Sequence, residues 1–184
     1  MRSFLGIPVS EAVQASALAE SERFKALGVR GGWTRRENMH ITLFFLGEIS
    51  YEKAQMMIDR YRSELEDWNA FPMVAEKVDS FAKQGNPRVL YLGFERSETF
   101  VQLYRRGVES FVHFGYTFPS KNVPHMTLCR IKSCPSLVDL GVPAQIIPKV
   151  PMMVDTVSLI HSTLTPQGPI YQELDRIRLQ TKGG

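Results

Sequence analysis

A short pattern of His, one apolar residue, Thr and Leu occurs twice in the chain, and it constrains the fold more than any other feature. The two copies are His40-Ile41-Thr42-Leu43 and His125-Met126-Thr127-Leu128. Successive side chains of a β-strand point to opposite faces, so each His shares a face with the Thr two residues later. Two such strands side by side would gather two imidazoles and two hydroxyls around one small anion. We therefore expect a fold that brings both motif strands to a common groove.

Length and composition indicate one globular domain. The chain has 184 residues, of which 43% are hydrophobic, and this suffices for a substantial core. We predict a single bilobal domain over 1–184, with interleaved lobes that correspond approximately to the halves 1–95 and 96–184. The formal net charge of +3 permits binding of a nucleic-acid end but falls short of the basic surface of a duplex-coating protein.

The sequence favours a reduced chain in the cytoplasm. Cys129 and Cys134 lack the further Cys or His ligands that a structural zinc site needs. No apolar stretch has the length of a signal-peptide core or of a membrane helix. We therefore expect a cytoplasmic protein without a membrane partner.

Hydrophobic periodicity and turn residues predict alternating strands and helices. The predicted strands cover 4–9, 40–46, 71–78, 88–94, 125–131, 154–164 and 171–179. The predicted helices start at the N-caps Ser10, Ser50 and Ser97 and end at Gly28, about Trp68 and about Phe114. Irregular backbone is expected around Gly31 and Gly32, and over the proline-rich residues 133–151. This order predicts an α+β fold with two pseudo-symmetric lobes, each an antiparallel-rich sheet with outer helices, around a central groove.

The two motifs supply the groups needed for displacement at phosphorus. Because the unperturbed pKa of His is about 6.5, one neutral imidazole can take a proton from water while an imidazolium protonates the departing oxygen. Thr42 and Thr127 can donate hydrogen bonds to the phosphate oxygens, and as β-branched residues they are stiff about χ1. This chemistry requires neither a metal nor a cofactor, so none is predicted.

Other interpretations of the motifs are open. A single His in an apolar strand is more often a hydrogen-bonded core residue than a catalytic one, but two copies at identical offsets favour a shared purpose. A noncatalytic protein that binds RNA ends would keep the same groove. A metal-dependent hydrolase would use the histidines as ligands, although no carboxylate stands at helical or strand spacing beside either His.

With their flanking residues, the motifs resemble those of the 2H phosphoesterase superfamily. The similarity is greatest to its branch of RNA 2′,3′-cyclic phosphodiesterases, once named 2′-5′ RNA ligases. It is carried by residues 37–48, which read Glu-Asn-Met-His-Ile-Thr-Leu-Phe-Phe-Leu-Gly-Glu, and by Pro-His-Met-Thr-Leu-Cys-Arg at 124–130. Weaker similarity at 87–93 and 162–171 extends the resemblance over nearly the whole chain.

The resemblance implies metal-independent hydrolysis of RNA 2′,3′-cyclic phosphate ends to 2′-phosphomonoesters. His40 would then donate a proton to the leaving oxygen, His125 would accept one from water, and Thr42 and Thr127 would hold the phosphate. The near-symmetry of the motifs leaves the acid and base roles open at this point. Reversible 2′-5′ ligation is compatible with the same proton transfers. A small cyclic nucleotide or a 2′-5′ linkage is the alternative substrate, and a monomer without an obligatory protein partner is expected.

Six further residues are candidates for contact with RNA. Strand alternation places Phe44 on the face of His40, where it would either stack on a base or pack as an ordinary core aromatic, and Tyr91 has the same two interpretations. Arg130 would contact the phosphate only if a bulge or the strand's end turned it inward, and would otherwise form a surface ion pair. Charged loop residues that could contact backbone phosphates are Arg35, Arg36 and Lys121.

Overall fold

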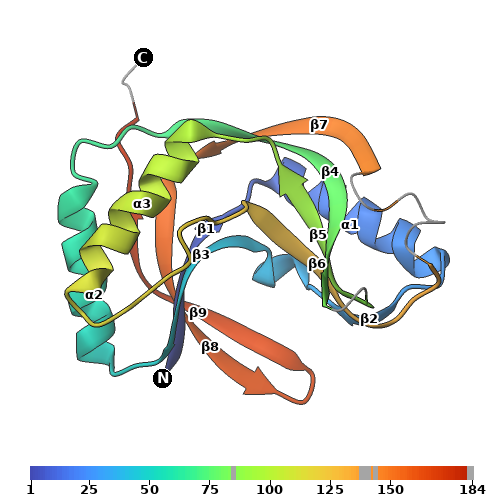
Figure 1. The fold of residues 1–184 in the computed structure, drawn as a ribbon, viewed down its shortest axis with the longest axis horizontal. Helices are drawn as coiled ribbons and strands as arrows, with labels where there is room; N and C mark the ends of the chain where they lie inside the picture. Colours follow the sequence, from blue (N-terminus) through green and yellow to red (C-terminus); the bar gives the residue numbers. More distant parts are fainter. Residues whose placement is uncertain (84–85, 137–141, 143–144, 182–184) are drawn as a thin grey trace.

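Two antiparallel β-sheets carry the motif strands. The computed structural model describes residues 1–83, 86–136, 142 and 145–181. The first sheet has the order β3-β1-β8-β9, and the second has the order β2-β6-β5-β4-β7 (Figure 1). The strands of the first sheet are β1 (Arg2–Pro8), β3 (His40–Glu48), β8 (Thr156–Thr165) and β9 (Gly168–Arg178). Those of the second are β2 (Arg30–Trp33), β4 (Phe71–Lys83), β5 (Asn86–Phe94), β6 (His125–Ser133) and β7 (Gln145–Val154). The motif strands β3 and β6 contact each other between the sheets, so the predicted α+β fold with two lobes is confirmed.

The lobes do not follow the two halves of the sequence. The first sheet combines β1 and β3 from the first half with β8 and β9 from the second. The second sheet likewise combines β2, β4 and β5 with β6 and β7. Because each sheet needs strands from both halves, the approximate division into 1–95 and 96–184 does not describe the lobes.

The helices cover the outer faces of the sheets. Helix α1 (Glu11–Ala26) contacts β6 and β7 of the second sheet, whereas α2 (Tyr51–Glu64) and α3 (Glu98–Val112) pack together beside the first sheet (Figure 1). The three predicted N-caps are confirmed, because each Ser hydroxyl accepts the backbone N–H three residues later. Helix α2 ends at Glu64, before the predicted limit near Trp68. No helix in the described part of the chain is long and apolar enough to span a membrane.

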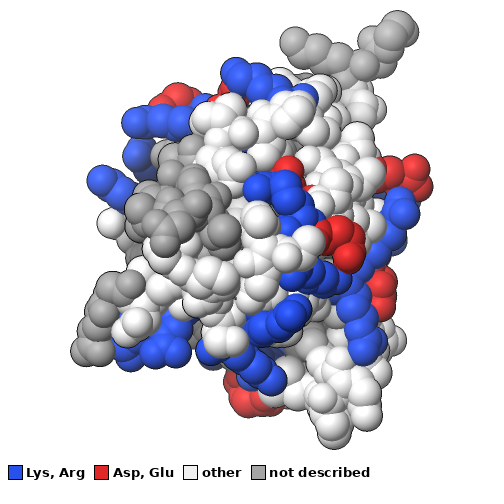
Figure 2. Space-filling view, turned by 90° about the vertical axis from the view of Figure 1, so that its right-hand side faces the viewer, with Lys and Arg blue, Asp and Glu red and all other residues white. Residues whose placement is uncertain are grey.

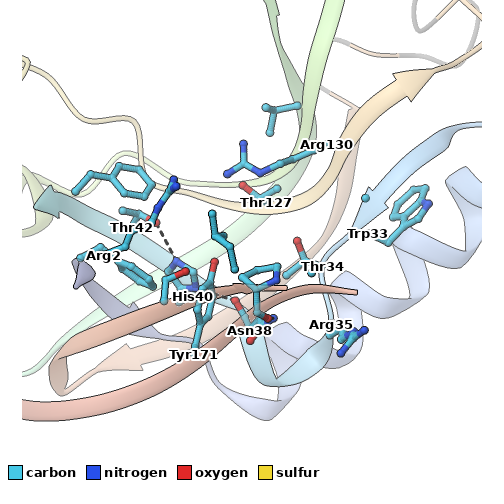
Figure 3. Close-up of a pocket in the computed structure, with 18 of the residues that line it drawn as sticks. Arg2, Trp33, Thr34, Arg35, Asn38, His40, Thr42, Thr127, Arg130 and Tyr171 are labelled. Atoms are coloured by element: carbon cyan, nitrogen blue, oxygen red, sulfur yellow. Dashed lines mark hydrogen bonds between the residues drawn. The ribbon is translucent and has the colours of Figure 1, made fainter. Parts of the chain in front are cut away.

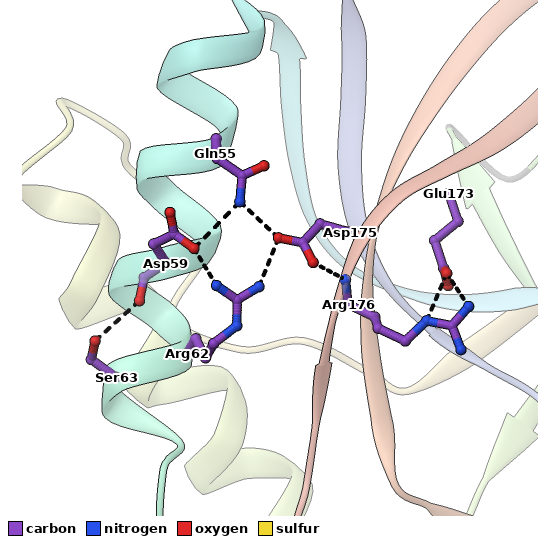
Figure 4. Close-up of polar contacts among 7 residues, drawn as sticks. All are labelled: Gln55, Asp59, Arg62, Ser63, Glu173, Asp175 and Arg176. Atoms are coloured by element: carbon purple, nitrogen blue, oxygen red, sulfur yellow. Dashed lines mark hydrogen bonds and ion pairs between the residues drawn. The ribbon is translucent and has the colours of Figure 1, made fainter.

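A polar cluster fixes α2 to the edge strand β9. Asp175 of β9 accepts hydrogen bonds of 2.7 Å from Gln55 Nε2 and 2.7 Å from Arg62 Nη2, both on α2 (Figure 4). Asp59 also pairs with the Arg62 guanidinium. The cluster therefore joins a helix of the first half to a strand near the end of the chain.

Two stretches that were expected to be irregular contain strands, although 134–136 lie outside any strand or helix. Gly31 and Gly32 lie in β2, paired with β6, and Gly31 is required there because a Cβ would lie only 2.2 Å from the Arg130 carbonyl oxygen. Residues 145–151 belong to β7, which tolerates Pro148 and Pro151 because it is an edge strand. Within the predicted 133–151 segment, residues 137–141 and 143–144 lie outside the described residues.

Candidate active site

The two motif strands have the same local structure, including a β-bulge directly after the Thr. Both strands have the same burial pattern. The His and the Thr are half-buried, the residue between them is buried, and the two residues after the Thr are also buried. In β3, Gly6 pairs with Thr42 and Leu5 with Phe44, so Leu43 is the extra residue. Leu128 is the extra residue of β6 in the same way. A bulge interrupts strict alternation, so the next side chain on the groove face comes three positions after the Thr instead of two.

The bulges decide which of the predicted contact residues face the groove. Phe44 does not, and its prediction as a base-stacking residue is wrong: its ring is fully buried and stacks at 4.9 Å on Tyr104 of α3. Phe45 takes the place on the groove face and is 61% exposed. Arg130 is turned into the groove by the bulge at Leu128, which is the inward placement considered from the sequence.

Tyr91 lies beneath another aromatic ring. It is only 4% exposed, and its ring stacks at 4.3 Å on Phe81. Phe81 is 37% exposed and lines the groove, so a base would meet Phe81 before Tyr91. The expectation that Tyr91 offers a stacking surface is therefore wrong, because Phe81 shields it.

Both motifs line one groove of about 890 Å³ between the two sheets. His40, Thr42, His125 and Thr127 all contribute to its surface, so the two histidines meet at one site as the repeated motif predicts. Figure 3 shows Thr127 and Arg130 on one side and His40, Thr42 and Tyr171 on the other. Further lining residues include Arg2, Phe4, Trp33, Thr34, Arg35, Asn38, Ser162, Leu164 and Pro169.

Two hydrogen bonds and two aromatic rings fix the orientation of the His40 ring. Its Nδ1 lies 2.7 Å from the Asn38 carbonyl oxygen, and its Nε2 lies 2.9 Å from the Thr42 hydroxyl. Phe4 stacks on the ring at 4.6 Å, and the edge of Tyr171 approaches it at 5.3 Å. A carbonyl oxygen only accepts hydrogen bonds, so Nδ1 carries the proton and neutral His40 has its lone pair on Nε2.

His125 has the same tautomer as His40, because its Nδ1 also donates a hydrogen bond to a backbone carbonyl oxygen. Its Nδ1 lies 2.8 Å from the carbonyl oxygen of Val123, again two residues before the His. The rings of Phe81 and Tyr91 contact the imidazole edge-on at 4.9 Å and 5.4 Å. Within the described residues no side chain bonds its Nε2, and the Thr127 hydroxyl is free as well. The second motif therefore offers both polar atoms to a ligand.

Burial favours the neutral form of both imidazoles in the free protein. Burial is the main cause that lowers the pKa of His40 to about 4, and the charges of His125 and Arg130 lower it further, against the opposing effect of the Asn38 carbonyl. Burial also lowers the pKa of His125, with a smaller contribution from Arg130. The effect of Arg130 on both pKa values is consistent with the two imidazoles facing the same groove.

Asn38 is a site residue that sequence analysis missed. Its side chain is nearly buried, and Nδ2 donates a 2.8 Å hydrogen bond to the Pro169 carbonyl near the start of β9. Its own carbonyl oxygen accepts from His40 Nδ1. Asn38 thus connects β9 to the imidazole. The only sequence signal is its position two residues before the motif, since its partner lies 131 residues away in the chain.

Loop residues connect the motif strands to their surroundings. The Asn122 side chain donates to the carbonyl oxygens of Thr42 at 3.2 Å and Leu43 at 3.4 Å, which ties the approach to β6 to the bulge of β3. At the other bulge, the Thr34 N–H donates to the Leu128 carbonyl at 2.9 Å. These contacts fix the two motif strands relative to one another.

The predicted basic residues are distributed unequally around the groove. Arg35 lines it and donates a 2.8 Å hydrogen bond to the Gln167 carbonyl, whereas Arg36 bonds the Gln14 side chain. Lys121 is exposed in the loop before β6. Lys and Arg are also the prevailing charged side chains in the lower half of the face shown in Figure 2. Among the described residues, no three His, Cys, Asp or Glu side chains are grouped closely enough to hold a metal ion.

A bilobal α+β fold in which two His-x-Thr strands line one groove defines a protein of the 2H phosphoesterase class. Comparison with known proteins agrees. The model of the LigT-like phosphoesterase family matches residues 5–91. The chain is 33% identical over 184 residues to the RNA 2′,3′-cyclic phosphodiesterase of Thermotoga maritima, covering 100% of this chain and 97% of that protein. It is 30% identical over 182 residues to the enzyme of the same name from Methanothermobacter thermautotrophicus, covering 97% and 99%.

Solved structures share the fold. A crystal structure of a Thermus thermophilus protein aligns over 100% of both chains with a TM-score of 0.77 and 24% identity. Escherichia coli LigT complexed with 3′-AMP aligns over 97% of both chains with a TM-score of 0.76 and 20% identity. Together with the full-length relatives, these comparisons show that the chain belongs to the LigT-like phosphoesterase family.

Proposed function

We propose that this protein hydrolyses the 2′,3′-cyclic phosphate ends of RNA to 2′-phosphomonoesters. The observation that carries the proposal is the pairing of two imidazoles in one groove, each with Nδ1 bonded to a carbonyl oxygen and Nε2 available for chemistry. Full-length relatives at 33% and 30% identity bear the name of this activity. The groove residues all come from one chain, so we propose that a monomer suffices for activity.

The cyclic phosphate would lie between the two motif strands. The hydroxyls of Thr42 and Thr127 and the guanidinium of Arg130 would contact its nonbridging oxygens, where charge accumulates during the displacement. His125 Nε2 would remove a proton from the attacking water as the new P–O bond forms. The bond from phosphorus to O3′ then breaks, and His40 Nε2 supplies the proton that this oxygen takes up. The phosphate stays on O2′, and two opposite proton transfers leave the charges balanced.

The substrate itself would prepare His40 to act as the acid. A pKa of about 4 leaves this imidazole neutral in the free protein at pH 7. An anionic phosphate beside Nε2 favours the imidazolium form, because an opposite charge nearby stabilises the charged state. The Thr42 hydroxyl, which is 2.9 Å from Nε2, can then rotate its proton toward a phosphate oxygen.

Two variants test the paired acid–base chemistry. His40→Ala and His125→Ala should each abolish turnover of a short RNA with a 2′,3′-cyclic end, measured in chelator with product analysis for a 2′-phosphate. His113→Ala is the matched control, because this His is exposed at the end of α3. Circular dichroism would confirm folding of all three. Turnover that survives in both motif variants would contradict the proposal.

Ligation follows from the same groove if the 5′-hydroxyl of a second RNA replaces water. The same two proton transfers would then yield a 2′-5′ linkage, and the product analysis would reveal it when a 5′-hydroxyl strand is added. A substrate panel that includes a small cyclic nucleotide and a 2′-5′ dinucleotide distinguishes the alternative substrates. Preferred turnover of either one over the RNA end would contradict the proposed substrate.

A further inference from the structure

We propose that Arg2 and Phe45 form a second subsite of the groove, which binds the phosphodiester on the 5′ side of the terminal nucleotide. This subsite would make the protein an enzyme of RNA ends rather than of cyclic mononucleotides. The inference rests on the proposed function, because it takes the cyclic phosphate to lie between the histidines.

Strand register places Arg2 on the groove face, next to the reaction centre. Along β1, Gly6 pairs with Thr42, Phe4 pairs with Phe45, and Arg2 pairs with Glu48. A second interruption of the ladder, at Leu46, keeps Phe45 and Glu48 on that same face. Phe4 stacks on His40, so Arg2 lies one step further along the face, two strand residues beyond Phe4.

The charge of Arg2 has no partner in the described part of the chain. Among the described residues, its guanidinium forms no ion pair or hydrogen bond, although its side chain is exposed and lines the groove. Glu48 lies opposite in the strand register, but it is 78% exposed and its carboxylate contacts the Met1 ammonium at 3.4 Å. By contrast, Arg35 at the other side of the groove in Figure 3 is bonded to the Gln167 carbonyl. An unpaired guanidinium at a groove is suited to bidentate contact with a phosphate.

Arg2 and Arg130 act on different parts of the groove. Arg130 lies on β6, three residues after Thr127 of the second motif. Arg2 lies on β1, two strand residues beyond Phe4, whose ring stacks on His40. The charges of both arginines also oppose the rise that burial causes in the pKa of Tyr171. Arg130 is placed for the reacting phosphate, and Arg2 for a phosphate beyond it.

The chemistry of an RNA end identifies that second phosphate. A strand with a 2′,3′-cyclic phosphate has no nucleotide on its 3′ side, so the neighbouring phosphate is the diester at the 5′ oxygen of the terminal ribose. Phe45, which pairs with Phe4 one step before Arg2 on this face, offers an exposed ring whose centroid lies 6.1 Å from that of Phe4. Bases stack on such rings without strong sequence preference. The terminal base would therefore stack on Phe45 while the 5′ phosphodiester of the same nucleotide contacts Arg2.

The test compares two substrates that differ by this phosphate. Adenosine 2′,3′-cyclic phosphate lacks a 5′ phosphodiester, and a diadenosine dinucleotide with a 2′,3′-cyclic end has one. Arg2→Gln should lower kcat/KM about tenfold for the dinucleotide, the loss expected for a charge-assisted hydrogen bond, and by less than about twofold for the mononucleotide. It should also reduce the slope of log kcat/KM against log salt by about 0.7 for the dinucleotide.

Two further variants serve as controls. Arg2→Lys keeps the charge but not the bidentate guanidinium, so it should recover only part of the activity on the dinucleotide and should keep the salt dependence of the unmodified protein. Arg96→Gln removes an exposed arginine that pairs with Glu98 outside the groove, and should leave kcat/KM unchanged for both substrates. Equal losses on both substrates with Arg2→Gln would place Arg2 at the reacting phosphate and overturn the subsite. Unchanged activity on both substrates would overturn it as well.

A binding experiment separates failure of the subsite from failure of the proposed function. If the unmodified protein turns over neither substrate, the proposed function is wrong. The subsite is then tested with the dinucleotide that ends in a 2′-phosphate and with adenosine 2′-phosphate, by calorimetric titration. Arg2→Gln should weaken binding of the dinucleotide about tenfold and leave the mononucleotide unchanged. Equal affinities of the variant and the unmodified protein for the dinucleotide would reject the subsite.

Discussion

Phe45 and Arg130 occupy equivalent positions on the two motif strands, three residues after Thr42 and Thr127. Each reaches the groove because a bulged Leu follows the Thr. The two strands therefore present the same backbone with different chemistry, an aromatic ring on one side and a guanidinium on the other. This difference breaks the symmetry of the two motifs. Under the proposed function, one side of the groove would take a base and the other a phosphate.

Substitution of Phe44 should mainly lower stability, whereas substitution of Phe45 should mainly weaken RNA binding. Phe44→Ala removes a fully buried ring from the cluster with Tyr61, Tyr104 and Phe111, and should lower the free energy of unfolding by about 3–5 kcal/mol. Phe45→Ala removes an exposed ring and should change it by less than about 0.5 kcal/mol. Instead, Phe45→Ala should weaken RNA binding by about 1–3 kcal/mol. Urea unfolding and RNA titration measure both quantities. A larger stability loss in Phe45→Ala than in Phe44→Ala would contradict the assigned faces.

These phenylalanines show what sequence reasoning could and could not establish. Helix starts at Ser10, Ser50 and Ser97 follow from local hydrogen bonds, and the sequence predicts them. A bulge is decided by the neighbouring strand, so strict alternation assigned Phe44 to the wrong face. Contacts between distant segments, such as Asn38 with Pro169, leave no periodic signal at all. The pairing of an imidazole with a hydroxyl could be predicted at both motifs, because the His and the Thr are only two residues apart in the sequence.

Protonation of His40 should make stability depend on pH. Its pKa is about 4 in the folded protein and about 6.5 in an unfolded chain, so the unfolded state binds more protons between these values. Stability contributed by neutral His40 is therefore fully present above about pH 6.5 and is lost as the pH falls toward 4, by about 3 kcal/mol at the limit. Urea unfolding at a series of pH values would measure this slope. His40→Gln, which has no titrating ring, should flatten it, and an unchanged slope would contradict the assignment.

Activity should be greatest on the acid side of neutrality. One imidazole must be protonated and the other neutral, and burial lowers the pKa of both below the usual value of about 6.5. The singly protonated pair is most populated between the two values. A plot of kcat/KM against pH should therefore be bell-shaped with its maximum below about pH 6.5 and a decrease toward alkaline pH. A flat profile from about pH 5 to 9 would count against paired imidazoles.

Substrate binding should raise the pKa of His40. The adenosine 2′-phosphate product places a negative charge between the motifs, and this charge favours the imidazolium form. NMR titration of the His40 ring should give a value near 4 for the free protein and a clearly higher one with product bound. The ring signals of His113, which is exposed at the end of α3, should not change when product is added, so this residue is the internal control. Equal changes in the ring signals of both histidines on addition of product would show that the phosphate is not bound at His40.

Removal of the Asn38 side chain should impair catalysis more than folding. Asn38→Ala breaks the 2.8 Å hydrogen bond to the Pro169 carbonyl and should cost about 1–3 kcal/mol of stability, because the carbonyl loses its partner. The backbone carbonyl that accepts from His40 Nδ1 remains, but the start of β9, which carries Pro169, is no longer tied to the Asn38 side chain. Tyr171, whose ring edge contacts His40, lies two residues further along β9. We therefore expect kcat to fall about tenfold or more, with a smaller change in KM, because the imidazole loses its fixed orientation rather than its contact with substrate. Asn122→Ala is the same change of side chain at the bulge of β3 and provides the comparison variant. A loss confined to KM in Asn38→Ala would show that Asn38 binds RNA instead of positioning His40.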